Sequence, residues 1–456
     1  MILSALEDIR KTLVSTKNGK RTLKHTINKK TCFLPFQTRN PERAKFKNGF
    51  TPVLGQFFRN VENAGSDFEL NEKSIIQEIS NTVGMDEEDR PYFERILESY
   101  LFEANSIRIF HPSMYKYIPL SESKESHGEE EIAHYLYDAL LERESQELED
   151  IVKLKEKEHV LSRLIQQHMP QLDQTEKKRK YIPTLPFIRE IFLEDIHTLL
   201  SNKDFFMNHI NLFLAYYYFY SSSQFTLKIN QFEKMDPASP TPIYYNLDWE
   251  ASNRSRMAVK TGFKVIMDNA RRLLSHVNTL EHLNYLLKTE NLNYMELQEQ
   301  FEALTEAERA DRLNDMYAWT CEYSEIVLGN QHEVNRKQDF MESCRQLHNQ
   351  LSKGLSLETK YRYALAINEI GKTYFLKTRG SLGNILNVTQ DFLILLTAVS
   401  VKHEKISLKQ LFIEFEKRGV YFDRYSKEAI VELFNKLNLI EKKSDSGDAQ
   451  YVKPIL

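Results

Sequence analysis

The chain has 456 residues, enough for roughly two to four domains of common size, and its formal net charge of −4 excludes a protein that binds polyanions over its whole surface. Glycine (14) and proline (13) are scarce, which argues against a long strand-rich fold and predicts a mainly α-helical, multi-domain protein. Three scattered cysteines and an N-terminus without a long apolar run indicate a soluble, cytoplasmic protein with no disulfide framework and no membrane segment.

Residues 1–120 are expected to form a basic N-terminal region with a helical subdomain over 71–104. Up to Arg59, lysine and arginine far outnumber the acidic residues, and they alternate with Phe33, Phe36, Phe46 and Phe50. Cations interleaved with aromatic rings can bind a nucleic-acid backbone and its bases. The same pattern suits a basic subdomain that docks onto an acidic partner or onto an acidic stretch of this chain, and we favour this second interpretation.

Residues 129–376 are expected to form a central helical domain. The highly charged stretch 129–167 carries an apolar stripe typical of a long exposed helix or a short helical hairpin. The aromatic run Tyr216–Tyr220 indicates a core helix that also serves a subunit interface. Thr305 and Glu308 form a capping box, which predicts a helix running to Gly329.

Four cations in the central region recur at a spacing that would place them on one face if 253–289 is a single helix: Arg256, Lys260, Lys264 and Arg271. Such a stripe is suited to phosphate contacts. Asp268 interrupts it, so a solvated face is the simpler interpretation of the same pattern.

Residues 384–456 have the element order of a winged-helix domain, behind a flexible joint at 378–381. A first helix carries Val388, Phe392 and Leu396, and a second follows a short strand at Ile406, with Ser407 as its N-cap and Gly419 at its end. Ser426 is expected to cap a third helix. Strands over 439–443 and 449–452 then form a hairpin.

If this domain binds DNA, its third helix enters the major groove and its hairpin reaches the backbone. The candidate contacts are the exposed cations of these two elements: Arg424, Lys427, Lys436, Lys442, Lys443 and Lys453. Glu428 and Glu432 on the same helix would face phosphates unfavourably. A winged helix that docks onto another protein is therefore an equally strong interpretation.

The sequence contains no convincing catalytic site, so we expect no catalytic residue, cofactor or metal ligand. The stretch 366–373 fits a permissive Walker A pattern, but it lacks inner glycines and follows an amphipathic helical segment rather than a buried strand. Glu441 and Lys443 have the spacing of some metal-dependent nucleases, without a partner acid that can be placed beside them. His276 and His282 are expected to be structural residues of a helix.

Two stretches resemble the DptG family. The first is Tyr-Tyr-Asn-Leu-Asp-Trp-Glu at 244–250, continued by Asn-Arg-Ser-Arg at 253–256 as far as Gly262. The second is the C-terminal tail from Ile440 to Leu456. DptG is the middle component of the DNA phosphorothioation-dependent restriction system, and the length and helical content of this chain agree with the resemblance.

The resemblance implies a role in antiphage defence, in which a sulfur-modified DNA backbone marks the host and unmodified DNA is attacked. Nucleotide hydrolysis would belong to ATPase and translocase-like partner subunits. This chain would be a non-catalytic subunit that bridges those partners and contacts double-stranded DNA. Two alternatives remain open: a metal-dependent nuclease subunit whose site has no recognisable motif, and a winged-helix transcription regulator.

Overall fold

The computed structural model describes residues 5–103, 106–141, 146–152, 160–175, 178–329, 334–442 and 450–456. The protein is mainly α-helical, as the composition predicts. One apolar cluster runs from Ile9 to Val452, through all three regions that the sequence suggested as domains. A second, smaller cluster lies between residues 75 and 169.

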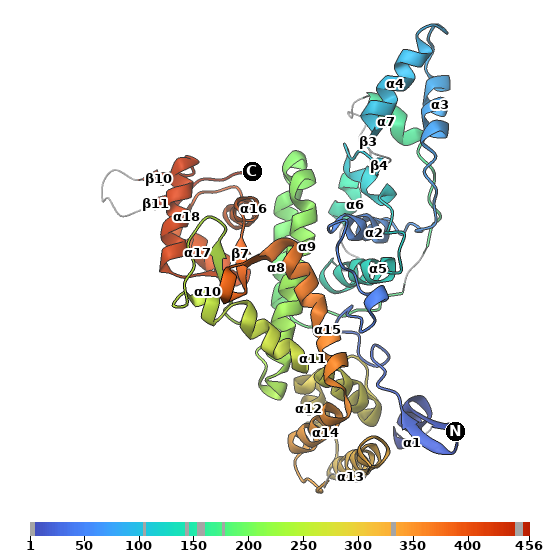
Figure 1. Ribbon diagram of the computed structural model, residues 1–456, viewed down its shortest axis with the longest axis vertical. Coiled ribbons are helices and arrows are strands. Elements are labelled where there is room, and N and C mark those ends of the chain that lie inside the picture. Colours follow the sequence, from blue (N-terminus) through green and yellow to red (C-terminus); the bar gives the residue numbers. More distant parts are fainter. Residues whose placement is uncertain are drawn as a thin grey trace.

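The centre of the molecule is α9 (Lys203–Ile229), a helix of 27 residues. Its second half is buried on every side, because apolar and aromatic residues occupy its whole circumference. Around it pack α8 (Pro186–Leu200), α11 (Phe263–Leu287) and α15 (Leu357–Ile370), and α15 continues into the π-helical turn η6 (Gly371–Phe375) (Figure 1).

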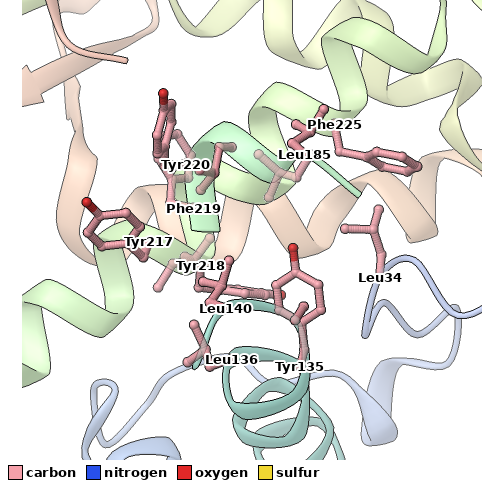
Figure 2. Packing of buried hydrophobic residues seen from close by; sticks show 14 of the residues in the cluster. Leu34, Tyr135, Leu136, Leu140, Leu185, Tyr217, Tyr218, Phe219, Tyr220 and Phe225 are labelled. Carbon is pink, nitrogen blue, oxygen red and sulfur yellow. The ribbon is translucent and has the colours of Figure 1, made fainter. Parts of the chain in front are cut away.

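The aromatic run Tyr216–Tyr220 is part of this core, as predicted, and its rings contact other elements of the same chain. Tyr218 has four aromatic neighbours, Phe36, Phe46, Phe50 and Tyr135. Figure 2 shows Tyr217–Tyr220 packed with Leu136, Leu140 and Leu185. The expected subunit interface is therefore wrong for this run, because these side chains are buried within the chain.

The N-terminal region docks onto the rest of the protein. It contains α1 (Ala5–Leu13), the hairpin β1 (Val14–Lys17) and β2 (Lys20–Leu23), and α2 (Thr51–Val61). All four of its phenylalanines named above are buried, so they offer no platform for bases. Glu281 of α11 accepts hydrogen bonds from the backbone N–H groups of Lys30 and Thr31, and Glu322 pairs with Arg10. This agrees with docking onto acidic residues of the same chain.

An arm projects from the upper part of the molecule in Figure 1. It contains α3 (Glu72–Thr82), α4 (Arg90–Leu101), the strands β3 (Phe102–Glu103) and β4 (Ser106–Ile107), and α7 (Val160–Gln167). The second apolar cluster joins these helices. The arm thus has a core of its own.

Over its described residues, 129–141, 146–152 and 160–167, the charged stretch 129–167 is not the exposed helix or hairpin that its composition indicated. It begins within α5 (Ser126–Tyr135), which continues as the π-helical turn η3 (Leu136–Leu141) and is followed by α6 (Gln146–Val152). Glu129 and Glu131 are buried because each has partners: Ser121 donates to Glu129, and Tyr181 and Lys180 donate to Glu131.

Four shorter helices lie beside α11: α10 (Met257–Lys260), α12 (Tyr294–Glu302), α13 (Glu306–Tyr323) and α14 (Phe340–Gly354). The capping box of Thr305 and Glu308 opens α13, as predicted. The helix passes through the π-helical turn η5 (Ser324–Leu328) and ends at Gly329, whose left-handed conformation suits glycine. His276 and His282 are buried in α11 and hydrogen-bonded to Tyr294 and Trp319.

The C-terminal unit contains α16 (Gln390–Val401), β8 (Ile406–Ser407), α17 (Leu408–Lys417), α18 (Arg424–Lys436), β10 (Ile440–Lys442) and β11 (Gln450–Val452). The three strands form an antiparallel sheet in the order β10-β11-β8. Ser407 caps α17 as predicted. The cap of α18 is Asp423, and Ser426 is a buried residue of the first turn, so the predicted cap was placed three residues too late.

A mixed sheet joins this unit to the centre. Its order is β6-β7-β5-β9, formed by β6 (Leu376–Thr378), β7 (Asn384–Val388), β5 (Tyr244–Leu247) and β9 (Tyr421–Phe422). β5 runs parallel to both β7 and β9. Val388 therefore belongs to a strand rather than to the first helix. The expected flexible joint at 378–381 is the turn of the β6–β7 hairpin, where Arg379 donates to the carbonyl of Leu247.

Candidate nucleic-acid interface

The segment 244–262, which carries the family resemblance, holds the C-terminal unit against the central helices. Its strand β5 lies between β7 and β9, and the loop that follows brings Arg256 beneath the start of α18. The Arg256 guanidinium binds Asp423 through two nitrogens, at 2.7 and 2.9 Å, and donates to Glu250 at 2.8 Å. It also donates to the hydroxyl of Ser426 and the carbonyl of Ala251, both at 2.8 Å.

This arginine cluster is almost closed to solvent. The side chains of Arg256, Glu250 and Asp423 are 6%, 9% and 11% exposed. Burial alone would raise the pKa of Asp423, but the hydrogen bonds from Arg256 and the Ser426 amide outweigh it and hold the pKa below its usual value. Both partners of the pair are thus charged at neutral pH, and Arg256 is fully engaged.

Arg256 is therefore a docking residue and not part of an exposed basic stripe. The stretch 253–289 is not one helix, because α10 ends at Lys260 and α11 begins at Phe263. Gly262 lies in the tight turn between them, where a Cβ atom would come within 2.1 Å of the Ala258 carbonyl oxygen. Lys260, Lys264 and Arg271 are exposed, but they lie on two helices, and Arg271 pairs with Asp268.

The predicted contacts on α18 are brought together on the outer part of the C-terminal unit, with carboxylates between them. Arg424 is 87% exposed and forms an exposed pair with Glu428. Lys427 is half-buried, lies over the Phe412 ring and pairs with Glu416. Lys436 is exposed at the end of the helix. Exposed pairs of this kind are worth no more than about 1 kcal/mol, so Arg424 can exchange its partner for a phosphate at little cost.

The structure describes only part of the hairpin on which three lysines were predicted as contacts. The backbone of Lys442 pairs with Gln450, while Lys443 lies outside the described residues. Lys453 is half-buried after β11. At the base of the hairpin Lys405 pairs with Glu441, at 2.9 Å.

One candidate contact was missed by the sequence reasoning. Tyr425, beside Arg424 in the first turn of α18, is 64% exposed, and the Arg256 guanidinium carbon lies 5.3 Å from its ring centroid. The buried arginine thus braces an exposed aromatic side chain at the start of the helix. The pair Arg424-Tyr425 at the start of a helix could have indicated this contact in the sequence. It was missed because taking Ser426 as the cap placed both residues outside the helix.

The Walker-like stretch 366–373 lies within α15 and η6. Backbone N–H groups there are engaged in helical hydrogen bonds and cannot wrap a phosphate as a glycine-rich loop does. Among the described residues, no three His, Cys, Asp or Glu side chains gather in a metal-binding arrangement. Within the same residues, no helix has the length and apolarity needed to cross a bilayer.

Comparison with models of known protein families gives no match for this chain, and comparison with curated proteins gives none either.

Proposed function

We propose that this protein is a non-catalytic subunit of a DNA phosphorothioation-dependent restriction complex, and that its C-terminal unit contacts double-stranded DNA. The proposal rests on the resemblance of segments 244–262 and 440–456 to the DptG family. The first segment also has a structural role, because its strand β5 and its residue Arg256 position the C-terminal unit.

The single observation that carries the DNA contact is the arrangement of the C-terminal unit. Its elements follow the order α16, β8, α17, β9, α18, β10, β11, and β8, β10 and β11 form one antiparallel sheet. We interpret this order, with the additional strand β9, as that of a winged helix, in which the third helix reads the major groove. Here the third helix is α18, and its exposed residues include Arg424, Tyr425 and Lys436.

The charge pattern supports a weak, backbone-directed contact. Glu428 and Glu432 lie on the same helix as Arg424 and Lys436, so few phosphates can be neutralised at once. Each neutralised phosphate contributes about −0.9 to the slope of log affinity against log salt. A contact of two to four phosphates would give a slope of roughly −2 to −4. This salt dependence is much weaker than that of a tight operator-binding repressor, whose slope is about −10. A restriction subunit held on DNA by its partners needs no more than such a weak contact.

The partner-binding part of the proposal is supported by the arm. Three large apolar side chains lie on one exposed face of α4 at intervals of four residues: Tyr92, Ile96 and Tyr100, with exposed fractions of 65%, 60% and 39%. Such a stripe on a projecting helix is typical of a protein-docking surface. We assign it to an ATPase subunit of the same system.

The test is binding of the purified chain to a generic duplex across a salt series. Reversing Arg424 and Lys436 together (Arg424→Glu, Lys436→Glu) should weaken binding at least tenfold and flatten the salt slope by about two units. The matched control is Lys260→Glu with Lys264→Glu, which reverses the same charge on α10 and α11. A second variant, Lys442→Glu with Lys443→Glu, tests the hairpin separately.

Equal losses in the control and the α18 variant would contradict the assignment of the contact to α18. Absence of binding at low salt, with stable co-purification of an ATPase partner, would make the C-terminal unit a protein-docking module. ATP hydrolysis by the isolated chain that is lost in Lys372→Ala would overturn the non-catalytic role.

A further inference from the structure

A cleft of about 360 Å³ opens between α11 and α14, beside the C-terminal end of α9. Its volume lies at the lower end of the range for small-molecule sites, roughly 300–1,000 Å³. The cleft is lined by the C-cap residue of α9 and by residues of the short helix η4 (Phe232–Lys234), α11 and α14: Asn230, Phe232, Arg272, His276, Arg345, His348, Asn349 and Ser352. The only charged residues among them are two arginines.

The two arginines differ in what they bind. Arg345 donates to both carboxylate oxygens of Glu233, each at 2.6 Å, and lies over the Phe232 ring. Arg272 is exposed and has no hydrogen bond or ion pair with any described residue. Lys360 lies behind the lining, where it donates to the carbonyl of Ser352 at 2.6 Å. Arg345 thus has a carboxylate partner, whereas Arg272 is available to a ligand.

The two histidines in the lining have lowered pKa values, mainly because they are buried. The rings of His276 and His348 are stacked with centroids 4.1 Å apart, and the Phe232 ring meets both of them edge-on. Burial, together with the positive charges of Lys360 and Arg272, lowers the pKa of His348 to about 4. Burial, His348 and Arg272 lower the pKa of His276 further still. Both rings are neutral at pH 7 and add no charge to the cleft.

Two further features are typical of a binding site. Phe232 has a φ of +57°, a strained conformation that bulky residues rarely adopt. The side-chain oxygen of Asn230 is buried and accepts no hydrogen bond from the described residues. A buried acceptor without a donor is satisfied when a ligand brings a hydroxyl or amino group.

We propose that this cleft binds a small phosphorylated ligand of the sugar-phosphate or nucleotide class, with Arg272 holding the phosphate. Asn349 and Ser352 supply further donors at the same wall, and the Asn230 oxygen accepts from a ligand hydroxyl. The phosphate could belong to a free nucleotide or to the end of a DNA strand. The inference is independent of the DNA contact at α18, since none of its residues belongs to the C-terminal unit.

The experiment is calorimetric titration of the full chain with inorganic phosphate, with AMP, and with a short duplex carrying 5′-phosphates. Arg272→Gln should weaken AMP binding at least tenfold, because a charge-assisted hydrogen bond is lost. Arg271→Gln is the matched control. This neighbouring arginine is exposed, does not line the cleft and pairs with Asp268, so binding should change by less than about twofold.

Asn349→Asp provides a second variant of nearly identical size, and its added negative charge should abolish phosphate binding while leaving the melting temperature unchanged. AMP binding with no preference for phosphorylated DNA ends would assign the site to a free nucleotide, and the reverse preference would assign it to a DNA end. Absence of binding of inorganic phosphate and AMP at millimolar concentration, together with duplex binding that Arg272→Gln leaves unchanged, would overturn the proposal. Equal losses in Arg271→Gln and Arg272→Gln would overturn it as well.

Discussion

Replacing Arg256 separates its docking role from the DNA contact that the sequence suggested. Arg256→Met keeps the length of the side chain but removes five hydrogen bonds, to Asp423, Glu250, Ser426 and the Ala251 carbonyl. The two carboxylates would remain nearly buried without their cation. Removal of one partner of a buried ion pair costs about 3–5 kcal/mol, and we expect a loss of that size in the free energy of unfolding.

The assay is urea unfolding at pH 7, combined with a double-mutant cycle. Asp423→Asn is the second member, because asparagine retains the capping oxygen of α18 while removing the charge. Arg256→Met with Asp423→Asn should be less destabilised than the sum of the two single variants by at least about 1 kcal/mol. Lys260→Met, on the exposed side of α10, should change stability by less than about 0.5 kcal/mol.

A loss below about 1 kcal/mol in Arg256→Met, accompanied by a loss of DNA binding as large as that of the α18 variant, would refute the docking role.

The stabilisation by the Arg256–Asp423 pair should also depend on pH. Because the pKa of Asp423 is lowered in the folded state, its contribution is fully present above about pH 4, the value of an unperturbed carboxyl group. It is lost as the pH falls through the lower folded value.

Four further outcomes are expected. Gly419→Ala should destabilise the protein by more than about 1 kcal/mol, because φ is +78° and the new Cβ would lie 2.1 Å from the Tyr220 ring. The control Gly380→Ala, also at positive φ but with open space around the new Cβ, should destabilise the protein less. Ile96→Lys on α4 should prevent co-purification of an ATPase subunit without changing the melting temperature, whereas retention of the partner would rule out the α4 surface. Burial lowers the pKa of His282 to about 3, so its contribution to stability should fall by up to about 1.4 kcal/mol per unit as the pH drops from about 6.5 towards 4. His282→Asn should make the decline in stability less steep by that amount, with the other buried histidines accounting for the remainder. Single-tryptophan variants retaining Trp249 or Trp319 should show coincident unfolding transitions, and separate midpoints would contradict the continuous core.

The sequence predicted the elements whose signals are local. The capping box at Thr305 and the N-cap at Ser407 each depend on residues within one turn, and both are present in the structure. The order of helices and hairpin in the C-terminal unit was also foreseen. Asp423 and Ser426 are both good capping residues three positions apart, so the choice between them depended on where the chain leaves β9.

The parts that could not be predicted depend on contacts between distant segments. β5 and β9 have four and two residues, too few for a periodic pattern, and their parallel pairing crosses more than 170 positions, from Tyr244 to Tyr421. The buried role of Arg256 depends on Asp423, 167 positions away. The phosphate-binding cleft joins Arg272 to residues of α14 in the same way. Charge spacing along the chain contains no information about such partners.

Two buried arginines anchor the C-terminal unit to the rest of the protein and limit its movement. Arg256 ties the start of α18 to the β5 loop, and Arg418, at the end of α17, binds Asp195 of α8 through two nitrogens at 2.5 and 2.8 Å. Undocking the unit would expose both charge pairs and break the β5–β7 and β5–β9 pairings at once. A freely hinged DNA-binding domain is therefore incompatible with this core. If α18 engages DNA, the duplex is held at a fixed orientation to α8 and α9, and a partner bound elsewhere on the chain is placed relative to that duplex by the fold itself.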